Sequence, residues 1–291
     1  MNANISSRPR LAVIGDPISH SLSPALQGFL IQYFNLSFTY EAVRVSARAL
    51  PAFIKELRAG NFSGANVTIP HKQAVMPLLD DLSETASQIG AVNTITSAAG
   101  LLTGHNTDAP GFLRAVQGAE IELKNQKVLI LGAGGAATAV LHVLLEAGAS
   151  TIYLCNRSDA RAEKLRGALS DAHQDKLRVI TWDDRGNWLQ TRPVTVIVNT
   201  TSAGMPPQQQ LSPLPKSALY EALTLIDLIY NPMETVLLRE AKQAGAKTLN
   251  GLAMLIYQGV AALELWSRQK LETGGIYGEI EKHLLAQMSN R

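Results

Sequence analysis

The sequence predicts an α/β protein of two domains. Its 291 residues suffice for about two domains at roughly 100 to 200 residues each. Short runs rich in Val and Ile alternate with longer segments of helical period, which is typical of a mostly parallel sheet covered by helices. A glycine-rich turn directly after one of these runs marks a nucleotide-binding domain. The runs expected to form strands are residues 11–15, 38–45, 64–69, 127–132, 150–155 and 194–198.

Two of the expected strands lead directly into helix-start signals. Ser23 precedes Pro24, the order of a capping residue before a proline in the first turn of a helix. Thr68 and Pro70 suggest the same arrangement after the third strand. Ligands of open α/β sheets bind beyond the carboxyl ends of strands, where loops pass into helices. Polar residues in these two loops are therefore candidate site residues.

The end of the chain has only helical patterns. Residues 252–266 form an apolar segment, and residues 276–288 form an amphipathic one after Gly274 and Gly275. We expect this helical block to pack on one of the two domains. Residues 205–215, rich in Pro and Gln, are expected to form a loop.

Composition limits the classes of partner. A hydrophobic fraction of 46%, a charged fraction of 17% and a formal net charge of +2 describe a soluble globular protein without the basic surplus of a nucleic-acid binder. Cys155, the single cysteine, cannot form an internal disulfide, which favours a cytoplasmic location. The apolar run 11–15 is too short for a signal peptide, and residues 128–145 read as strand, turn and helix rather than a membrane span. We expect small-molecule partners, and neither nucleic acid nor membrane.

The segment from Lys127 to Arg157 reads as a buried strand, a glycine turn, an amphipathic helix and a second strand. Gly132, Gly134 and Ala137 fit the GxGxxG/A pattern, which provides a tight turn, room for a pyrophosphate and close helix packing. A dinucleotide site is the interpretation that we favour over a purely structural turn. Its phosphate contacts would come from Gly132, Ala133, Gly134, Gly135 and Ala136.

The second strand of this unit ends without the acidic residue that binds the ribose of NAD. Asn156, Arg157 and Ser158 stand there instead, and Arg161 follows one helical turn later. A guanidinium binds a 2′-phosphate through two charge-assisted hydrogen bonds, so this end predicts NADP. The alternative is that both arginines are solvent-exposed charges at a helix start, and Asp159 between them keeps that alternative open.

Several loops carry polar residues suited to a site. Ser21 and Ser23 place two hydroxyls at a helix start, which suits a carboxylate, although one serine could simply cap the helix. Lys72 is expected in the first turn of a helix, where the helix dipole disfavours a cation, and broken local rules often mark function. The remaining candidates are Thr68 at a strand end, Asn93, Asp108, which could instead stabilise a helix start, and Thr200 in a loop after a strand.

Nine motifs, in this order and spread over nearly the whole chain, resemble the shikimate dehydrogenase family. They are GDPISHSLSP, NVTIPHK, AVNT, HNTDAPG, GAGGA, NR, NTTSAGM, IDLIYNP and NGLAMLIYQG. The resemblance implies NADPH-dependent reduction of 3-dehydroshikimate to shikimate, in the pathway to chorismate and aromatic amino acids. It also implies an N-terminal α/β substrate domain, a Rossmann-type domain and a C-terminal helical segment that returns to the first domain. The expected boundaries are 1–108 with 250–291 for the substrate domain, and 109–249 for the NADP domain.

The resemblance also implies roles for individual residues. Ser21 and Ser23 would bind the substrate carboxylate, and Tyr230 would close the pocket. Gly251 and Met254 would lie near the nicotinamide. The residues around the ring hydroxyls of the substrate would be Thr68, Lys72, Asn93, Asp108 and Gln258. The chain departs from the family at Asn250, where many relatives have Asp, and at Ala253, where Gly is frequent.

The reaction requires a general acid, because hydride transfer to a carbonyl carbon leaves an alkoxide that must be protonated. Lys72, paired with Asp108, is the expected acid, and His71 is its strongest rival, ahead of His20 and His105. The closest alternative function is that of a quinate dehydrogenase or a dual quinate/shikimate dehydrogenase. A catalytically silent binding relative is less consistent with the sequence, because Lys72 and Asp108 are both present. The chain is expected to be a monomer or a homodimer.

Overall fold

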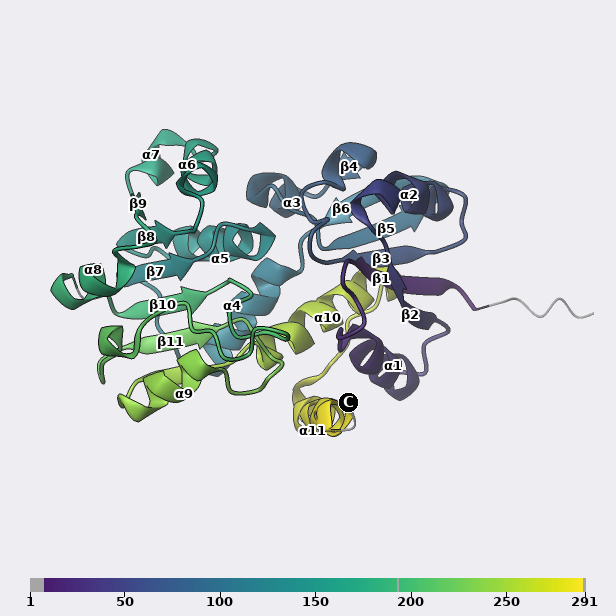
Figure 1. Ribbon diagram of the computed structural model, residues 1–291. Helices are drawn as coiled ribbons and strands as arrows, with labels where there is room; N and C mark the ends of the chain where they lie inside the picture. The colour runs from purple at the N-terminus through teal and green to yellow at the C-terminus, as the bar shows by residue number, and fades with distance from the viewer. Residues whose placement is uncertain (1–7, 193, 290–291) are drawn as a thin grey trace, which may run out of the picture. The chain divides into compact units, whose positions relative to one another are not determined.

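The computed structural model describes residues 8–192 and 194–289, and the chain forms two compact units (Figure 1). The first unit combines the residues up to Thr107 with those from Gln258 onward, and the second runs from Asp108 to Tyr257. Among the described residues, each unit contains a six-stranded sheet. This arrangement confirms the predicted α/β fold.

The sheet of the first unit is mixed, with the strand order β2-β1-β3-β5-β6-β4. Its parallel part confirms the three strands expected near the N-terminus. The antiparallel hairpin formed by β5 and β6 was not expected. Its two-residue turn, Ala99-Gly100, has φ values of 50° and 81°, and alanine is not a usual residue in that conformation. The strands are β1 (Arg10–Gly15), β2 (Thr39–Arg44), β3 (Gly64–Val67), β4 (Asp81–Leu82), β5 (Thr94–Ala98) and β6 (Leu101–His105).

The two faces of this sheet differ in character. One face packs against α2 through an apolar core that includes Ile14, Val67 and Phe53. The other face lies against the C-terminal part of α10, where the Trp266 indole occupies the space over Gly64 and donates a hydrogen bond to the Ile95 carbonyl at 2.9 Å. The helices of this unit are α1 (Ser23–Tyr33), α2 (Leu50–Arg58), α3 (Glu84–Ile89), the end of α10 (Leu252–Ser267) and α11 (Tyr277–Ser289). The expected closing helical block therefore returns to the first unit, and α11 lies beside α1.

The sheet of the second unit is entirely parallel, in the order β12-β11-β10-β7-β8-β9. The chain starts in the middle at β7, proceeds to one edge and returns to β10 on the other side of β7. Ligands of doubly wound sheets bind at such a reversal of strand order, beyond the carboxyl ends of the strands. The strands are β7 (Lys127–Leu131), β8 (Thr151–Cys155), β9 (Leu177–Ile180), β10 (Val196–Asn199), β11 (Thr224–Asp227) and β12 (Lys247–Leu249).

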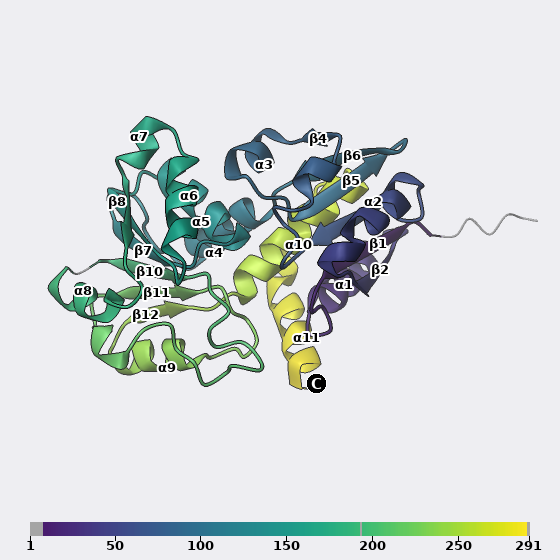
Figure 2. The same ribbon diagram turned by 45° about the horizontal axis from the view of Figure 1, so that its top comes forward.

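Helices cover the second sheet, and Figure 2 shows α4 and α5 side by side, as their contacts also indicate. The helices are α4 (Asp108–Gly118), α5 (Gly135–Glu146), α6 (Asp159–Gly167), α7 (Asp171–Gln174), α8 (Arg185–Thr191) and α9 (Val236–Gln243), together with the start of α10. Short 3₁₀ helices lie at Ala47–Ala49, Met76–Leu78, Lys216–Ala218 and Gly274–Ile276. The stretch 205–215 contains neither helix nor strand, as expected.

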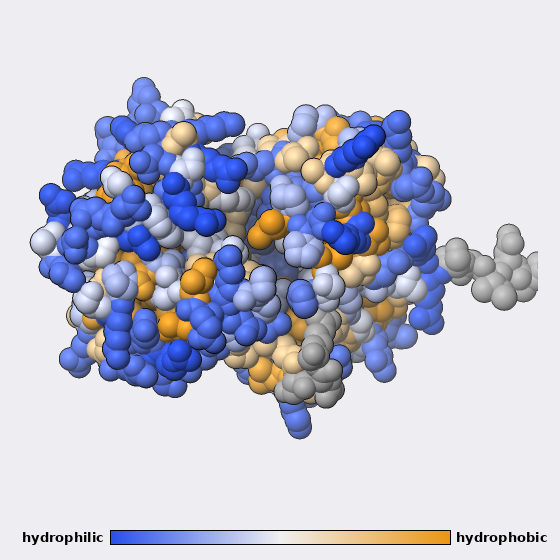
Figure 3. Space-filling view, viewed as in Figure 1, coloured by the Kyte–Doolittle hydropathy of each residue, from blue (hydrophilic) through white to orange (hydrophobic). Residues whose placement is uncertain are grey.

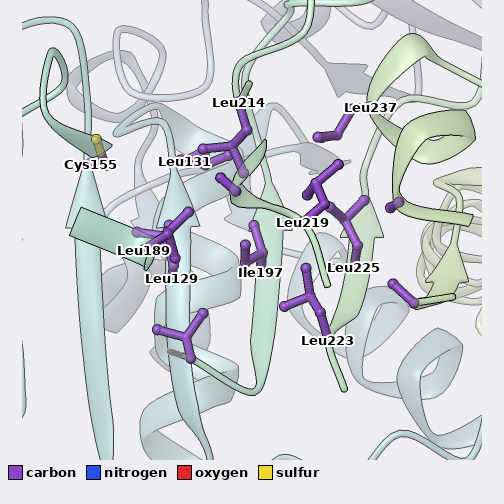
Figure 4. Close-up of a cluster of buried hydrophobic side chains, with 14 of the residues drawn as sticks. Leu129, Leu131, Cys155, Leu189, Ile197, Leu214, Leu219, Leu223, Leu225 and Leu237 are labelled. Carbon is purple, nitrogen blue, oxygen red and sulfur yellow. The ribbon is translucent and has the colours of Figure 1, made fainter. Parts of the chain in front are cut away.

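The core of the second unit shows how alternate strand residues anchor the helices (Figure 4). Leu129, Leu131 and Ile197 of the strands pack against Leu189 of α8 and Leu237 of α9. Each fully buried side chain of this kind stabilises the fold by about 1.5 to 3 kcal/mol. Cys155 belongs to the same cluster, and burial raises the pKa of its thiol to about 12. The cysteine therefore acts as a small apolar side chain.

The surface face shown in Figure 3 is mainly hydrophilic, with apolar side chains in small groups. Within the described part of the chain, no helix is both long and apolar enough to cross a membrane. The same residues contain no cluster of His, Cys, Asp and Glu that could hold a metal ion.

Candidate active site

The start of α1 positions the two serines of the first unit. Leu22 occupies the cap position and Ser23 is the first helical residue, so the expected capping role of Ser23 is wrong. The Ser21 hydroxyl instead accepts a hydrogen bond from the backbone amide of Ser23 at 3.2 Å. Burial raises the pKa of Tyr40 of β2, and an interaction with the Ser23 side chain partly offsets this shift. Both serines are half-buried at a helix start, the environment expected for an anion-binding pair.

Lys72 lies in a turn and not in a helix. Residues 72–75 form turns, and the short 3₁₀ helix Met76–Leu78 follows. The expectation of a lysine placed against a helix dipole was therefore wrong. The Lys72 carbonyl accepts a hydrogen bond from the Val92 amide at 2.8 Å, which places the lysine backbone beside Asn93. The Lys72 side chain is half-buried.

Thr68 connects β3 to this turn. Its amide donates to the Ile14 carbonyl at 2.9 Å, and its carbonyl accepts from the His71 amide. Its methyl group occupies the space that a side chain at Gly15 would fill, 2.5 Å from the ideal Cβ position. Gly15 therefore lets the loops after β1 and β3 approach one another, so that the serine loop and the lysine loop lie at the same edge of the sheet.

The histidines near these motifs have other partners. His71 is 1% exposed and its Nε2 lies 2.6 Å from the Val45 carbonyl, so Nε2 must carry the proton and donate it there. His105 is hydrogen-bonded to the Thr96 hydroxyl at 3.0 Å, and burial lowers its pKa. His20 is exposed. These contacts give His71 and His105 structural roles and favour Lys72 as the acid.

In the first unit, uncharged side chains form a hydrogen-bond network that leads from Tyr40, near the two serines, to Asn93. The Tyr40 hydroxyl donates to Asn66 Oδ1 at 2.6 Å, and Asn66 Nδ2 donates to the Asn93 carbonyl and to Thr94. Asn93 Oδ1 accepts from the Thr107 amide at 2.7 Å. Asn93 Nδ2 lies 2.9 Å from the Thr107 hydroxyl and 3.4 Å from Gln258 Oε1. The structure therefore brings together Ser23, Asn93 and Gln258, three of the predicted residues.

Sequence reasoning missed Tyr40, Asn66 and Thr107. Burial raises the pKa of Tyr40, which keeps its hydroxyl protonated and able to donate. Asn66 is a buried polar residue in a strand whose neighbours are apolar. That contrast was the available signal, because a buried amide without hydrogen-bond partners would be costly.

The glycine turn of the second unit has the geometry expected of a dinucleotide site. Gly132 has a φ of +106°, and a side chain there would lie 2.5 Å from the Thr200 hydroxyl. That hydroxyl donates to the Leu131 carbonyl at 2.7 Å. A Cβ at Gly134, the residue that caps α5, would meet nothing within 4 Å. The residues therefore fit a pyrophosphate, because the open space at Gly134 adjoins the amides at the start of α5.

The end of β8 presents two positive charges to solvent. Arg157 and Arg161 are exposed, and within the described ranges neither guanidinium has an ion-pair partner. Asp159 stands in the first turn of α6, where a carboxylate favours the helix dipole, and it pairs with neither arginine. The side-chain amide of Asn156 donates a hydrogen bond to the Ser158 carbonyl at 2.9 Å, which fixes the shape of this loop. These groups fit a 2′-phosphate.

The start of α10 depends on close backbone packing. A side chain at Gly251 would lie 2.0 Å from the Leu228 carbonyl oxygen, and the Gly251 amide donates to the Ile229 carbonyl at 3.0 Å. Asn250 uses both ends of its amide: Oδ1 accepts from the Leu252 amide at 3.1 Å, and Nδ2 donates to the Met233 carbonyl at 3.2 Å. A carboxylate could not make the second bond. The departure at Asn250 therefore has a structural reason, and nothing in the structure explains Ala253.

The other predicted residues of this unit lie at the ends of its elements. Asp108 is the first residue of α4 and is buried. Tyr230 is half-buried in the loop after β11, and Met254 is buried in the first turns of α10. Sequence reasoning missed Asp227, the last residue of β11, which is 0% exposed. Burial raises the pKa of this carboxyl to about 6, against hydrogen bonds from Thr235, Ile229 and Asn199.

Comparison with known proteins covers both units. Residues 13–95 match the family described as shikimate dehydrogenase substrate binding domain, and residues 114–232 match shikimate / quinate 5-dehydrogenase. A relative from Moorella thermoacetica, shikimate dehydrogenase (NADP(+)), is 40% identical over 257 residues, which are 88% of this chain and 87% of that protein.

Two solved structures show the same fold. The shikimate 5-dehydrogenase of Listeria monocytogenes, in complex with shikimate and NAD, has a TM-score of 0.84 at 33% identity, covering 98% of this chain and 99% of that one. The shikimate 5-dehydrogenase of Thermus thermophilus, in complex with NADP(H) and shikimate, has a TM-score of 0.82 at 39% identity, covering 94% and 99%. Two family matches and a relative of this identity and coverage agree with the order of motifs in the sequence, and this chain belongs to the shikimate dehydrogenase family.

Proposed function

We propose that this protein catalyses the reversible, NADPH-dependent reduction of 3-dehydroshikimate to shikimate, a step in the pathway to chorismate and aromatic amino acids. The observation that carries the proposal is the agreement over both units with a relative named shikimate dehydrogenase (NADP(+)). The first unit supplies a half-site of neutral hydrogen-bond partners with two serines at a helix start. The second supplies a glycine turn and two exposed arginines. We therefore assign the first unit as the substrate domain and the second as the NADP domain.

The second unit holds NADP in this proposal, and the bound nicotinamide supplies the hydride. The amides of the turn hold the pyrophosphate, and Arg157 and Arg161 hold the 2′-phosphate together with Asn156 and Ser158. Gly251 and Met254 would lie near the nicotinamide, and Thr200 would also contact the cofactor. The turn residues are Gly132, Ala133, Gly134, Gly135 and Ala136.

The first unit supplies most of the substrate contacts in this proposal. Ser21 and Ser23 bind the carboxylate, because their hydroxyls stand at a helix start that favours an anion. Thr68, Asn93 and Gln258 bind the ring hydroxyls. The network through Tyr40 and Asn66 keeps the amides of Asn93 and Gln258 in fixed orientations. Tyr230, from the second unit, closes over the substrate.

Lys72 is assigned the proton transfer, with Asp108 as its partner. As hydride reaches the carbonyl carbon, negative charge develops on the oxygen, and the Lys72 ammonium donates a proton to it. The Asp108 carboxylate orients the ammonium of the lysine. In the reverse direction, the neutral amine accepts the proton of the hydroxyl. The chain is proposed to act as a monomer or homodimer in the cytoplasm.

The test is a spectrophotometric screen of shikimate and quinate, each with NADP and with NAD, that follows the absorbance of the reduced nicotinamide. We expect the highest kcat/KM for shikimate with NADP. A higher value for quinate, or for NAD, would replace the proposal with the quinate or dual-specificity alternative. The Lys72→Met variant is the control, since it keeps the length of the side chain but removes its charge.

A further inference from the structure

Asp227 is a buried carboxyl group that bonds to three segments of the second unit. Its Oδ1 accepts from Asn199 Nδ2 at 3.0 Å and from the Ile229 amide at 3.1 Å. Its Oδ2 accepts from the Thr235 hydroxyl at 2.7 Å. All three donors are neutral. An ionised carboxyl in such surroundings is costly, because none of these three partners carries a positive charge and hydrogen bonds alone must offset its desolvation.

The first of these bonds organises the loop after β10. Asn199 lies next to Leu131 and Asp227 in the register of the sheet. Its Oδ1 accepts from the amide and the hydroxyl of Thr201, at 3.0 and 2.7 Å. The Thr201 hydroxyl in turn accepts from the Ala203 amide at 3.2 Å. The orientation of Asn199 therefore decides the path of residues 199–203.

The other two bonds organise the loop after β11. The Ile229 amide is held by Asp227, and the carbonyls of residues 228 and 229 form the surface on which Gly251 packs. Thr235 caps α9 by accepting from the Leu238 amide at 3.2 Å. The methyl group of Thr235 also touches the place where Gly204 lacks a side chain, 3.1 Å from the ideal Cβ position. One carboxyl thus connects the loop after β10, the loop after β11 and the start of α10.

The sheet topology indicates which end of a dinucleotide these segments face. The glycine turn after β7 suits the pyrophosphate, and the arginines after β8 suit the 2′-phosphate of the adenosine half. β10 and β11 lie on the opposite side of β7 from β8. In the proposed complex the nicotinamide half would therefore extend over the carboxyl ends of β10 and β11, where Asn199 and Asp227 stand.

We propose that Asp227 is a positioning residue that holds the nicotinamide-side loops, residues 199–205 and 228–235, in one arrangement. The inference rests on the proposed NADP site of the second unit. A carboxylate is required because its two oxygens accept all three donors. An amide has a single acceptor oxygen, and its NH₂ group would face the Thr235 hydroxyl, which could then no longer donate there. The pKa of Asp227 is raised because this arrangement removes its carboxyl group from water.

The test compares two ligands of the full chain by isothermal titration calorimetry. NADPH reaches the nicotinamide side, whereas adenosine 2′,5′-bisphosphate carries only the adenosine and 2′-phosphate end. We expect Asp227→Asn to raise the Kd of NADPH by about 10-fold or more and to leave the Kd of the bisphosphate within about 2-fold, the precision of such a comparison. We also expect kcat to fall.

Asp80→Asn is the matched control in the first unit. Asp80 accepts hydrogen bonds from Arg58 and from the Leu102 amide, so its substitution also removes structural bonds of a carboxylate. We expect it to lower the melting temperature without changing either Kd. If Asp227→Asn weakens both ligands equally, or lowers only the melting temperature, Asp227 has a general structural role and the proposal is overturned.

A second pair of variants covers the case in which Asp227→Asn does not fold. Thr235→Val removes the hydroxyl at constant shape, whereas Thr235→Ser keeps it. We expect the valine variant to show the selective loss of NADPH affinity and the serine variant to stay close to the parent. Equal effects of the two would overturn the proposal. The ligand comparison does not involve shikimate, so failure of the proposed reaction leaves it interpretable, and a parent protein that binds neither ligand would overturn both proposals.

Discussion

The two units each bury a polar network, and the networks differ in charge. In the first unit the network contains only neutral groups, from Tyr40 through Asn66 to Asn93. In the second unit the network centres on the carboxyl of Asp227. Burial raises the pKa of both Tyr40 and Asp227. The consequences are opposite, because the shift keeps a tyrosine neutral at all ordinary pH values but brings an aspartate close to physiological pH.

This difference shows that a buried polar network can be built from neutral groups alone or around an ionisable one. A neutral network orients amides and hydroxyls without any dependence on pH. A charged one binds its donors more strongly, since hydrogen bonds to ions are roughly twice as strong as neutral ones, but its desolvation is costly. The proposed substrate half-site uses the first solution and the proposed cofactor half-site uses the second.

The largest expected effect concerns Lys72, which we place in neither network. Lys72→Met should lower kcat by about 10² to 10⁴ with little change in KM, because a general acid acts mainly in the transition state. Steady-state kinetics with shikimate and NADP provide the measurement. His71→Gln is the companion variant and should affect stability more than kcat. Near-normal kcat in Lys72→Met, together with a large loss in His71→Gln, would transfer the acid role to the histidine.

The two networks should differ most clearly in how they make the stability of the protein depend on pH. The pKa of Asp227 is raised from 3.8 to about 6, so the folded protein binds this proton more tightly than the unfolded chain does. The resulting stabilisation, about 3 kcal/mol at most, is complete below the unfolded pKa and is lost as the pH rises through about 6. Above that pH the parent carries a buried charge among neutral partners.

Urea unfolding at a series of pH values tests this expectation. The free energy of unfolding of Asp227→Asn, relative to the parent, should increase between pH 3.8 and about 6 and stay constant above it. The same difference for Tyr40→Phe should stay flat over that range, because Tyr40 remains protonated throughout. A flat difference for both variants would remove the contrast between the networks.

The third effect separates the two ends of the cofactor. Arg157→Ala should raise the KM for NADP by about 10- to 150-fold, since a hydrogen bond to a charged group contributes about 1.5 to 3 kcal/mol. The KM for NAD, which lacks the 2′-phosphate, should stay nearly unchanged. Initial-rate measurements with both cofactors decide the point. Equal increases would mean that Arg157 stabilises the loop after β8 and does not contact the phosphate.

The smallest effect is expected in the neutral network. Tyr40→Phe removes the hydroxyl between Ser23 and Asn66 and should raise the KM for shikimate about 5-fold, the equivalent of one neutral hydrogen bond of about 1 kcal/mol. The affinity for NADP should not change. Tyr220→Phe is the matched control, because the Tyr220 hydroxyl bonds to the Val194 carbonyl in the second unit. If both variants alter only the melting temperature, the network contributes to folding and not to substrate binding.

The sequence was sufficient to predict the elements whose signals are local. The glycine turn after β7 and the strand before it could be read because their residues are adjacent in the chain. Local reasoning failed at Ser23 and Lys72, where the actual cap and the turn depend on how the loops after β1 and β3 meet. The connections within both polar networks escaped prediction because the bonded partners lie far apart: 26 residues separate Tyr40 from Asn66, and 28 separate Asn199 from Asp227.

Gly134 and Gly251 are both glycines of the second unit, but different structural constraints act on them. At Gly251 the protein itself leaves no space for a side chain, whereas at Gly134 the protein leaves the space open. Selection for folding alone would therefore preserve Gly251 and let Gly134 drift, since only a bound ligand penalises a side chain there. A descendant of this chain that had lost its cofactor would be recognised by a larger residue at position 134 beside an unchanged glycine at 251. The residues at positions 134 and 251 would together indicate whether a relative still binds a dinucleotide.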